Sequence, residues 1–379
     1  MDFTLSEQQQ AIGELAATIL TDTVPPEVLR HLEAGSDHLA VAAWQALARA
    51  DLVGLAVPEA DGGAGLGVFD AGLVAEQVGR HVALVPYWPT VAAATTLARW
   101  APADLKGRLL PAAIAGDGPL TVALWEPGTT GVSGRPAVTA TTDGEGWRLD
   151  GVKQPVPWAG HAAAIVVPAT VGEADVALFA VAPGTPGVTA VAEATISREP
   201  FHTVTFDGAR VGADALVAAP GGGDAEAALA DRARTTTALL CATALGVMEG
   251  ALALTATHVS ERHQFGSPIG TFQAVAQRSA DGYIDTEAVR LTSWSAAWRL
   301  DAGLPADDEL AVAAYWASEG GQRVVHTAQH LHGGIGVDTD YPVHRYFRWA
   351  KVLELLVGGA SGSLVRLGTS LAAGAPAPA

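Results

Sequence analysis

The sequence predicts an α+β protein in which a β-sheet domain lies between two helical domains along the chain. Three observations predict it: apolar residues recur every three or four positions up to about residue 118, short β-branched runs occupy residues 119–218, and long helical patterns return from residue 224. We therefore expect an N-terminal helical domain over 1–118, a middle β domain over 119–218 and a C-terminal helical domain over 224–372. The Ala-, Gly- and Pro-rich end, 373–379, is expected to be a disordered tail.

The N-terminal zone begins with an amphipathic helix in LSEQQQAIGELAATIL (5–20). Ser6 or Thr4 can cap its first turn. Four of its apolar residues are expected to share one face: Leu5, Ile12, Leu15 and Ile19. A glycine-rich turn in AVPEADGGAGLGVFDAGLVAEQVGR (56–80) then runs into another helix. The zone is therefore predicted to be helical.

The middle zone consists of short runs rich in β-branched residues and bounded by Gly, Pro and Asp. Six such runs are LTVALW, AVTATT, GWRLDGV, AAIVVPAT, VALFAVA and HTVTFDGARV. Strands of this length at such intervals are typical of an antiparallel sheet or barrel.

The C-terminal zone contains three long helical segments, over residues 225–262, about 269–300 and 307–331. In the second segment an apolar stripe is expected: Phe272, Val275, Ile284 and Leu291. The third segment stops at Gly333-Gly334, because paired glycines terminate helices.

Composition excludes several classes of function. The chain of 379 residues has a net charge of −18, and basic clusters are few, which argues against nucleic-acid binding. No run of about 18 uninterrupted apolar residues occurs, so no membrane span is expected. No signal peptide is evident at the N-terminus. The single cysteine, Cys241, fits a reducing cytosol and lies in an apolar run, where a buried small residue is favoured over a nucleophile. We expect a cytoplasmic protein.

Two motifs carry candidate chemistry. ERHQFGSPIGTFQ (261–273) crosses a Gly/Pro turn between helices, where Gly266 permits the turn and Arg262 complements the helix dipole. HLHGGIGVDTDYPVHRYFRWAK (330–351) contains a glycine loop whose backbone N–H groups can face an anion. Each motif alone is also explained as a structural turn.

Taken together, the two motifs, their spacing of roughly 60 residues and the DFTLSEQQ start resemble the acyl-CoA dehydrogenase family over essentially the whole chain. The resemblance implies a tetramer whose C-terminal domain is a four-helix bundle. It implies FAD as cofactor and oxidation of the Cα–Cβ bond of an acyl-CoA thioester. In the family each FAD lies across a subunit boundary: one chain holds the flavin ring, the acyl chain and the base, and its neighbour holds the adenosine and pyrophosphate.

The half of the site that is donated to a neighbour's FAD matches the family. The resemblance assigns cofactor contacts to eight residues: Arg262, Gln264, Phe265, Gln273, His330, Gly333, Gly334 and Gly336. His330 stands where the family has glutamine, and an imidazole can still form a hydrogen bond.

The half that would hold a flavin of its own departs from the family. In WEPGTTGVSG, Trp125 replaces a threonine that bonds the flavin ring and Gly131 replaces a phosphate-binding serine. Pro155 and Pro157 of KQPVPW stand at further ring contacts, and proline provides neither an N–H nor a hydroxyl. We expect this half to have lost its flavin.

The catalytic base is also missing, so no catalytic residue is expected in this chain. Val357 and Thr236 occupy the two positions where the family places its glutamate, and Thr237 replaces a CoA-binding arginine. Valine does not titrate, and a threonine hydroxyl is too weak a base at neutral pH. Glu354 and Glu249 are the candidates for a relocated base, but we interpret both as surface or interface carboxylates.

Four histidines crowd one segment: His326, His330, His332 and His344. A glycine turn separates them, so they do not form a ligand pair on one helix face with a carboxylate, and no metal site is expected.

This asymmetric loss indicates a non-catalytic subunit of a heterotetrameric acyl-CoA dehydrogenase that completes the FAD site of a paralogous catalytic chain. The chain resembles the base-lacking subunits of actinobacterial sterol side-chain degradation. That resemblance implies a steroid-CoA in the partner's pocket and an electron-transfer flavoprotein or similar acceptor. Two alternatives remain open: a homotetrameric flavoprotein with a relocated base or base-free oxygenation, and a CoA-ester-binding or scaffold protein without flavin.

Overall fold

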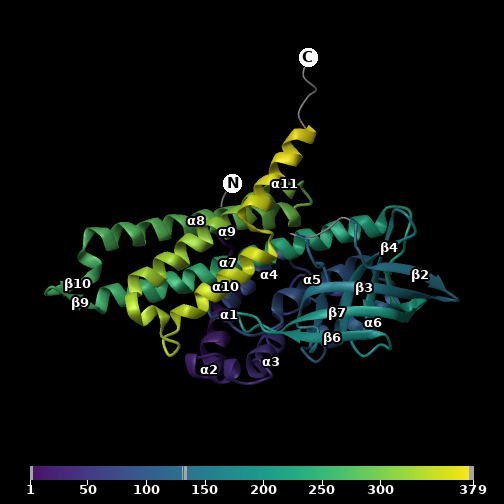
Figure 1. The fold of residues 1–379 in the computed structure, drawn as a ribbon, viewed down its shortest axis with the longest axis horizontal. Helices are drawn as coiled ribbons and strands as arrows, with labels where there is room; N and C mark the ends of the chain where they lie inside the picture. The colour runs from purple at the N-terminus through teal and green to yellow at the C-terminus, as the bar shows by residue number, and fades with distance from the viewer. Residues whose placement is uncertain (1–2, 130, 132–134, 375–379) are drawn as a thin grey trace, which may run out of the picture. The chain divides into compact units, whose positions relative to one another are not determined.

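The computed structural model describes residues 3–129, 131 and 135–374 (Figure 1). The described chain separates into two compact units. A helical unit combines the described residues of the stretches 3–27, 72–83 and 237–374, and a sheet unit combines those of 28–71 and 84–236. These units group residues by their contacts in space and join stretches that are distant along the sequence. They therefore do not test the three domain boundaries expected along the sequence, which stay a prediction. The α+β class and the order helix, sheet, helix are confirmed.

The helical unit is built from long helices that pack along one another. Its helices are α1 (Glu7–Thr23), the end of α4 (Val68–Arg80), most of α7 (Asp224–Glu261), α8 (Gln273–Asp301), α9 (Asp307–His332), α10 (Val343–Leu356) and α11 (Gly359–Gly374). Helices α8, α10 and α11 all pack against α9. The connection from α7 to α8 contains a hairpin of β9 (His263–Gln264) and β10 (Ser267–Pro268), followed by the 3-10 turn η3 (Ile269–Thr271). A second 3-10 turn, η4 (Gly333–Val337), follows α9. Because α11 reaches Gly374, helix extends into the expected tail 373–379, whose residues 375–379 lie outside the described part.

Helix α1 begins as expected but buries a different face. Ser6 is its N-cap: the Gln9 N–H donates to Ser6 Oγ at 3.2 Å, and the Gln9 side chain accepts from the Ser6 N–H at 3.1 Å. The buried residues are Ile12, Ala16 and Leu20, whereas Leu15 is 44% exposed. The predicted face was wrong at Leu15, because the buried residues follow one another at intervals of four positions and Leu15 lies beside that row.

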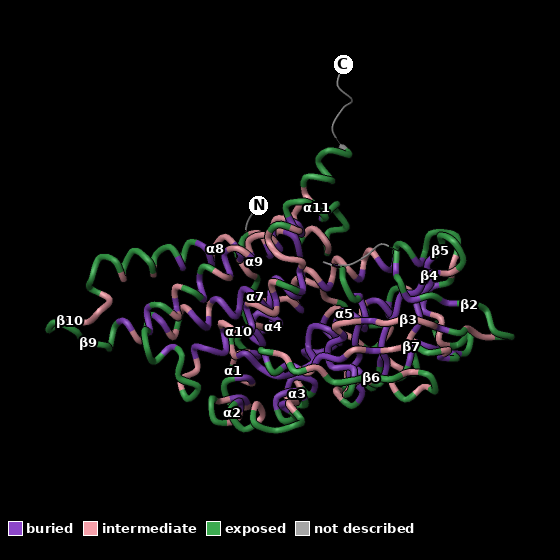
Figure 2. Tube along the Cα trace, viewed as in Figure 1, coloured by how far each residue is buried: buried purple, intermediate pink, exposed green. Residues whose placement is uncertain are grey.

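The apolar stripe expected on α8 exists but lies on the surface (Figure 2). Ile284 is 63% exposed, and Phe272 and Leu291 are exposed as well. The buried face of α8 consists mainly of small and polar residues, such as Gly282 and Ala296. A Cβ at Gly282 would lie 3.5 Å from the Leu252 side chain of α7, so this small residue faces the neighbouring helix, while the large apolar residues are left exposed.

Helix α7 crosses the end of α4 at glycines. A Cβ atom added at Gly246 would lie 1.7 Å from the Glu76 carbonyl oxygen, and one added at Gly79 would lie 2.0 Å from that of Thr243. Cys241, in the same part of α7, is fully buried as expected, and burial raises the pKa of its thiol to about 12, which disfavours the thiolate.

Two segments, 224–261 and 343–373, are long and apolar enough to cross a membrane, judged by length and composition alone. Neither contains the run of about 18 uninterrupted apolar residues on which the expectation of no membrane span was based. The most apolar window of the first is 72% buried inside the protein, as in the core helix of a water-soluble domain. That of the second is 17% buried.

The sheet unit is an eight-stranded sheet accompanied by helices. Its helices are α2 (Pro26–Ala34), α3 (Val41–Arg49), the start of α4, α5 (Tyr87–Trp100), α6 (Ala103–Ile114) and the start of α7, with 3-10 turns η1 (Glu59–Asp61) and η2 (Ala213–Ala215). Its strands are β1 (Leu120–Val122), β2 (Thr139–Asp143), β3 (Gly146–Pro157), β4 (Ala164–Val171), β5 (Asp175–Val181), β6 (Val188–Glu193), β7 (Phe201–Gly212) and β8 (Leu216–Ala218).

The strands follow the order β6-β7-β3-β2-β4-β5-β8, and β1 pairs with β4. Most pairs are antiparallel as expected, but β4 pairs in parallel with both β1 and β2. Strands β6 and β8 were not predicted. One face of the sheet holds a continuous core that includes Leu149, Phe179 and Phe206.

Candidate functional site

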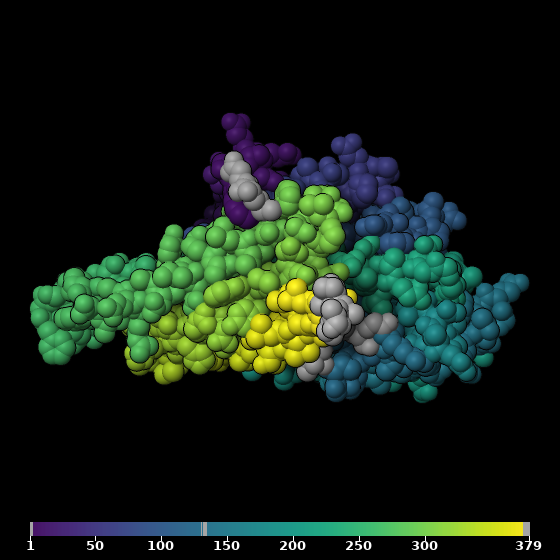
Figure 3. All heavy atoms as spheres, turned by 90° about the horizontal axis from the view of Figure 1, so that it is seen from above, coloured from purple at the N-terminus to yellow at the C-terminus, as the bar shows by residue number. Residues whose placement is uncertain are grey.

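The first part of the site is the tip of the α7–α8 connection. Phe265 has φ +52° and Gly266 φ +83°, so the chain reverses between β9 and β10, and the Ile269 N–H closes the loop on the Arg262 carbonyl at 2.8 Å. Phe265 is 95% exposed, with its ring edge toward Phe272 at a centroid distance of 6.2 Å. Three more of the expected cofactor residues are exposed here: Arg262, Gln264 and Gln273. Figure 3 shows this end of the helical unit, in green, projecting beyond the rest of that unit.

The second part is the glycine loop after α9. Gly333 has φ +59°, a conformation that favours glycine. A Cβ at Gly334 would meet no atom within 4 Å, whereas one at Gly336 would lie 3.0 Å from the Gln329 carbonyl oxygen. Gly333 and Gly334 are exposed, as is His330 one turn earlier, while Gly336 is buried. The loop therefore presents open backbone at Gly334 and packs tightly at Gly336.

A cluster that the sequence analysis missed joins the two parts. The rings of His258 on α7 and His332 on α9 stack, with centroids 4.4 Å apart and planes 25° apart. His332 Nδ1 lies 2.7 Å from the Ala328 carbonyl oxygen, so it carries the proton, and its Nε2 accepts from the Tyr341 hydroxyl at 3.2 Å. Burial lowers the pKa of His332, which keeps this neutral form. Since Arg262 follows one turn after His258, the cluster fixes both parts of the surface to each other.

The structure also shows a groove between α8 and α9 with a volume of about 870 Å³. His330 lines it together with Arg278, Arg323 and His326, and the guanidinium of Arg323 bonds Asp285 at 2.5 and 2.8 Å. The sequence analysis did not connect these four side chains. Their spacing on the predicted helix (323, 326 and 330) places them on one face and was the available signal.

The positions for a flavin ring in the receiving half lie in the sheet unit. Trp125 is 3% exposed and packs edge-on against Trp88, with ring centroids 6.2 Å apart. Pro155 lies at a shift in the β3–β7 register, and Pro157 pairs with Phe201. Gly131 is buried with φ +81°, while residues 130 and 132–134 of the predicted phosphate loop lie outside the described residues.

Both positions at which a base was sought are buried. Val357 is the C-cap of α10, and its carbonyl oxygen accepts from Arg366 Nη2 at 2.8 Å. Thr236 is buried on α7, and its hydroxyl has no hydrogen-bond partner among the described residues. Neither side chain removes a proton from carbon at neutral pH.

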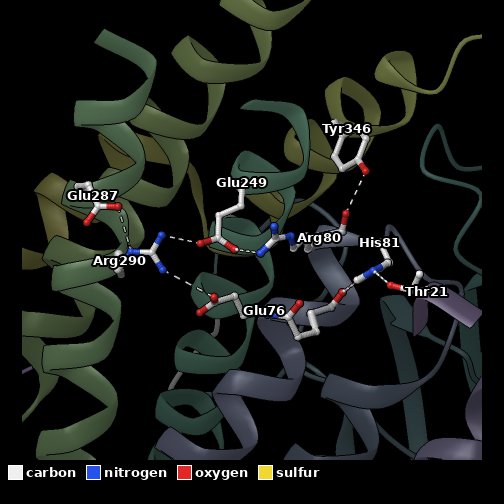
Figure 4. Close-up of polar contacts among 9 residues, drawn as sticks. Thr21, Glu76, Arg80, His81, Glu249, Glu287, Arg290 and Tyr346 are labelled. Atoms are coloured by element: carbon white, nitrogen blue, oxygen red, sulfur yellow. Dashed lines mark hydrogen bonds and ion pairs between the residues drawn. The ribbon is translucent and has the colours of Figure 1, made fainter. Parts of the chain in front are cut away.

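The candidates for a relocated base are both held by cations. Glu354 pairs with Lys351 at 2.6 Å. The interpretation of Glu249 as a surface or interface carboxylate was wrong for this chain: its side chain is 12% exposed and its Oε1 lies 2.5 Å from Arg290 Nη2 (Figure 4). Arg290 also lies 3.7 Å from Glu76 and 3.1 Å from Glu287. Such charge pairing opposes use of Glu249 as a base.

The crowded histidines are engaged separately. His332 belongs to the stacked cluster, the His344 ring lies 2.7 Å from the Tyr341 carbonyl oxygen, and His326 stands edge-on to Phe347. Within the described residues no group of three or more His, Cys, Asp or Glu is placed to hold a metal ion.

The two halves differ in how well they fit FAD. The exposed surface offers a guanidinium, two carboxamides, an imidazole and open backbone at Gly334, which are groups that suit a pyrophosphate and an adenosine. In the receiving half, an indole and two prolines offer little to a flavin ring. The residues therefore fit the adenosine end of FAD in the helical unit and do not fit the ring in the sheet unit.

Comparison with known proteins agrees with this architecture. The sequence profile described as "Acyl-CoA dehydrogenase, N-terminal domain" matches residues 6–117, and that described as "Acyl-CoA dehydrogenase, C-terminal domain" matches residues 222–367. Acyl-CoA dehydrogenase FadE27 of Mycobacterium tuberculosis is 41% identical over 98% of this chain and 99% of its own length.

Two solved structures are similar over nearly the whole chain. The ChsE4-ChsE5 complex from Mycobacterium tuberculosis contains a chain that is 41% identical with a TM-score of 0.91, covering all of both chains. A variant of the Tcur3481-Tcur3483 steroid ACAD contains one that is 43% identical with a TM-score of 0.89, covering 98% of this chain and 99% of that one. The resemblance drawn from the motifs is thus confirmed, and this chain belongs to the acyl-CoA dehydrogenase family.

Proposed function

We propose that this chain is the base-lacking subunit of a heterotetrameric, FAD-dependent acyl-CoA dehydrogenase with two copies of each subunit. One observation carries the proposal. The surface that would serve a neighbour's FAD is complete and exposed, from Arg262 to Gly334, whereas the positions for this chain's own flavin and base are buried and filled by Trp125, Thr236 and Val357. Uniform decay would have damaged both.

In this proposal the residues of the helical unit hold the adenosine and pyrophosphate end of a partner's FAD. Arg262 supplies a positive charge for the pyrophosphate, while Gln273 and His330 supply hydrogen bonds. The His258–His332 stack holds the loop that presents Gly334. FAD, when bound, supplies the acceptor for the hydride removed from the acyl-CoA. The partner supplies the flavin-ring pocket, the acyl pocket and the glutamate.

The nature of the partner and substrate is supported by the similar structures. One is described as a complex of two named components and the other as a two-component steroid ACAD, which favours a paralogous partner chain. By the same likeness we propose a steroid side-chain CoA thioester as substrate and an electron-transfer flavoprotein or similar acceptor. The lone buried cysteine and the acidic composition favour the cytoplasm.

The proposal is tested by expressing the chain alone and together with candidate paralogous acyl-CoA dehydrogenase chains from the same genome. Alone, the chain should be colourless or insoluble, because it lacks ring contacts and leaves a large apolar surface uncovered. Together, the two chains should co-purify as a yellow complex with one FAD for each pair of unlike chains. A yellow, active homotetramer of this chain alone would overturn the proposal and support the first alternative.

Two variants separate the donated half from the receiving half. Arg262→Ala should lower the FAD content of the complex, whereas Arg49→Ala, an exposed arginine on α3, should leave it unchanged. Val357→Glu should not create a second active site. The new carboxylate would stand close to the Arg366 guanidinium, which would lower its basicity, and the ring contacts are absent as well. Full FAD content in Arg262→Ala would contradict the assigned role of this surface.

A further inference from the structure

A buried arginine in the sheet unit lacks a counter-charge. Arg232 lies on the first turns of α7 and is 1% exposed. Its Nη1 donates to the Val166 carbonyl oxygen of β4 at 2.9 Å. Its Nε and Nη2 are buried and have no acceptor among the described residues. Burial lowers the pKa of Arg232 to about 9, which still leaves the guanidinium charged at neutral pH. A buried charge without a partner is strongly unfavourable, so something must satisfy these donors.

The neighbouring charges do not compensate Arg232. Lys153 of β3 is also buried, and it donates to the carboxylate of Glu126. Glu126 Oε1 accepts the Ala137 N–H at 2.7 Å as well, so this carboxylate is already used. Burial lowers the pKa of Lys153 to about 8, and the charge of Arg232 adds to that shift. At neutral pH Lys153 and Glu126 balance each other, and Arg232 is left as one excess positive charge.

A second unsatisfied group stands beside Arg232. Thr236 follows four residues later, on the same face of α7, and its buried hydroxyl has no partner in the described part of the chain. The Val166 carbonyl that holds Arg232 also accepts the Ala123 N–H at 3.0 Å. Ala123 precedes Trp125 by two residues, so Arg232 lies at the end of the sheet where the flavin-ring contacts have been lost.

We propose that Arg232 and Thr236 bind one small monoanion, such as chloride or a short carboxylate, inside the receiving half of this chain. A single negative charge balances the excess positive charge, and it accepts the free N–H groups and the hydroxyl together. The complete burial of both side chains selects a small ligand over a flavin or a CoA pyrophosphate. The half that no longer holds a flavin would thus be a closed anion site that stabilises the sheet unit.

The test measures thermal stability of the protein as it purifies, with its co-purifying chain if one is present. Sodium bromide replaces sodium gluconate at constant ionic strength and pH 7. Because bromide binds the folded state only, the melting temperature of the wild type should rise by about 3 °C as bromide increases. The rise should vanish in Arg232→Met and be smaller in Thr236→Val. Arg234→Met is the matched control, since Arg234 pairs with Asp231 at 3.5 Å near the surface, and it should keep the full rise.

A second measurement does not depend on the variants folding. Crystals of the wild type grown in bromide should show an anomalous peak within hydrogen-bond distance of Arg232 Nε or Nη2. No peak there, or the same bromide dependence in Arg232→Met as in the wild type, would overturn the proposal. FAD content and subunit composition are read from the same preparations. A flavin bound by this chain alone would refute the proposed function, whereas a missing bromide peak in a flavin-free chain would refute only the anion site, so the two failures are distinguishable.

Discussion

Replacing Glu76 with glutamine should remove a pH-dependent loss of stability from the helical unit. Glu76 lies on α4, buried beside Arg290 and Glu249 (Figure 4). Burial, reinforced by the charge of Glu249, raises the pKa of Glu76 from 4.5 to about 8. Between these values the folded chain binds a proton that the unfolded chain has released, so stability falls as pH rises through this window.

The size of the effect follows from the shift. One extra proton bound by the folded state changes the free energy of unfolding by about 1.4 kcal/mol for each pH unit. Between pH 5 and pH 7 the free energy of unfolding of the wild type should therefore fall by about 3 kcal/mol through this group. Glutamine keeps the shape of the side chain without its titration. The variant should therefore be spared that loss, which corresponds to about 4 °C in melting temperature at pH 7 for a chain of this length.

The assay is the melting temperature of wild type and variant from pH 5 to pH 8. Glu287→Gln is the matched control, because Glu287 contacts the same Arg290 at 3.1 Å from a more exposed position, where an ion pair contributes less than about 1 kcal/mol. If wild type and Glu76→Gln lose stability in parallel over this range, the carboxyl is already ionised in the folded protein and the reasoning fails.

Three further predictions follow from other contacts. His332→Leu removes two hydrogen bonds from the loop that presents Gly334, and should weaken FAD retention by the complex about tenfold in dialysis; unchanged retention would exclude a positioning role. Lys153→Met leaves the carboxylate of Glu126 buried without its cation and should destabilise the sheet unit by about 3 kcal/mol in denaturant titration, whereas a loss below about 1 kcal/mol would contradict this. Gly246→Ala places a methyl group 1.7 Å from a carbonyl oxygen and should abolish soluble expression, while Gly334→Ala, in open space, should express normally.

The order of elements could be predicted from sequence because the period of apolar residues is a local property. The boundaries of α7, α8 and α9 lie within a few residues of the expected segments for this reason. The missed strands gave weaker local signals: β6 is largely exposed or half-buried, and β8 has three residues. The parallel pairs of β4 depend on segments distant along the chain, which no local pattern reports.

The candidate site was predictable to the extent that it depended on residue identity. Trp125, Thr236 and Val357 could be assessed from side-chain chemistry alone. The environment of Glu249 could not, because its partner Arg290 lies 41 residues away on another helix. The stack of His258 on His332 and the isolation of Arg232 depend in the same way on packing between distant segments.

The outer face of α8 bears on how the protein is made. Phe272, Ile284 and Leu291 line that helix without cover from the rest of the described chain, and Phe265 stands almost bare at its tip. A newly synthesised chain without a binding partner would expose this apolar surface to chaperones, proteases and other copies of itself. The yield of folded protein would then depend on how quickly another chain covers this face after synthesis.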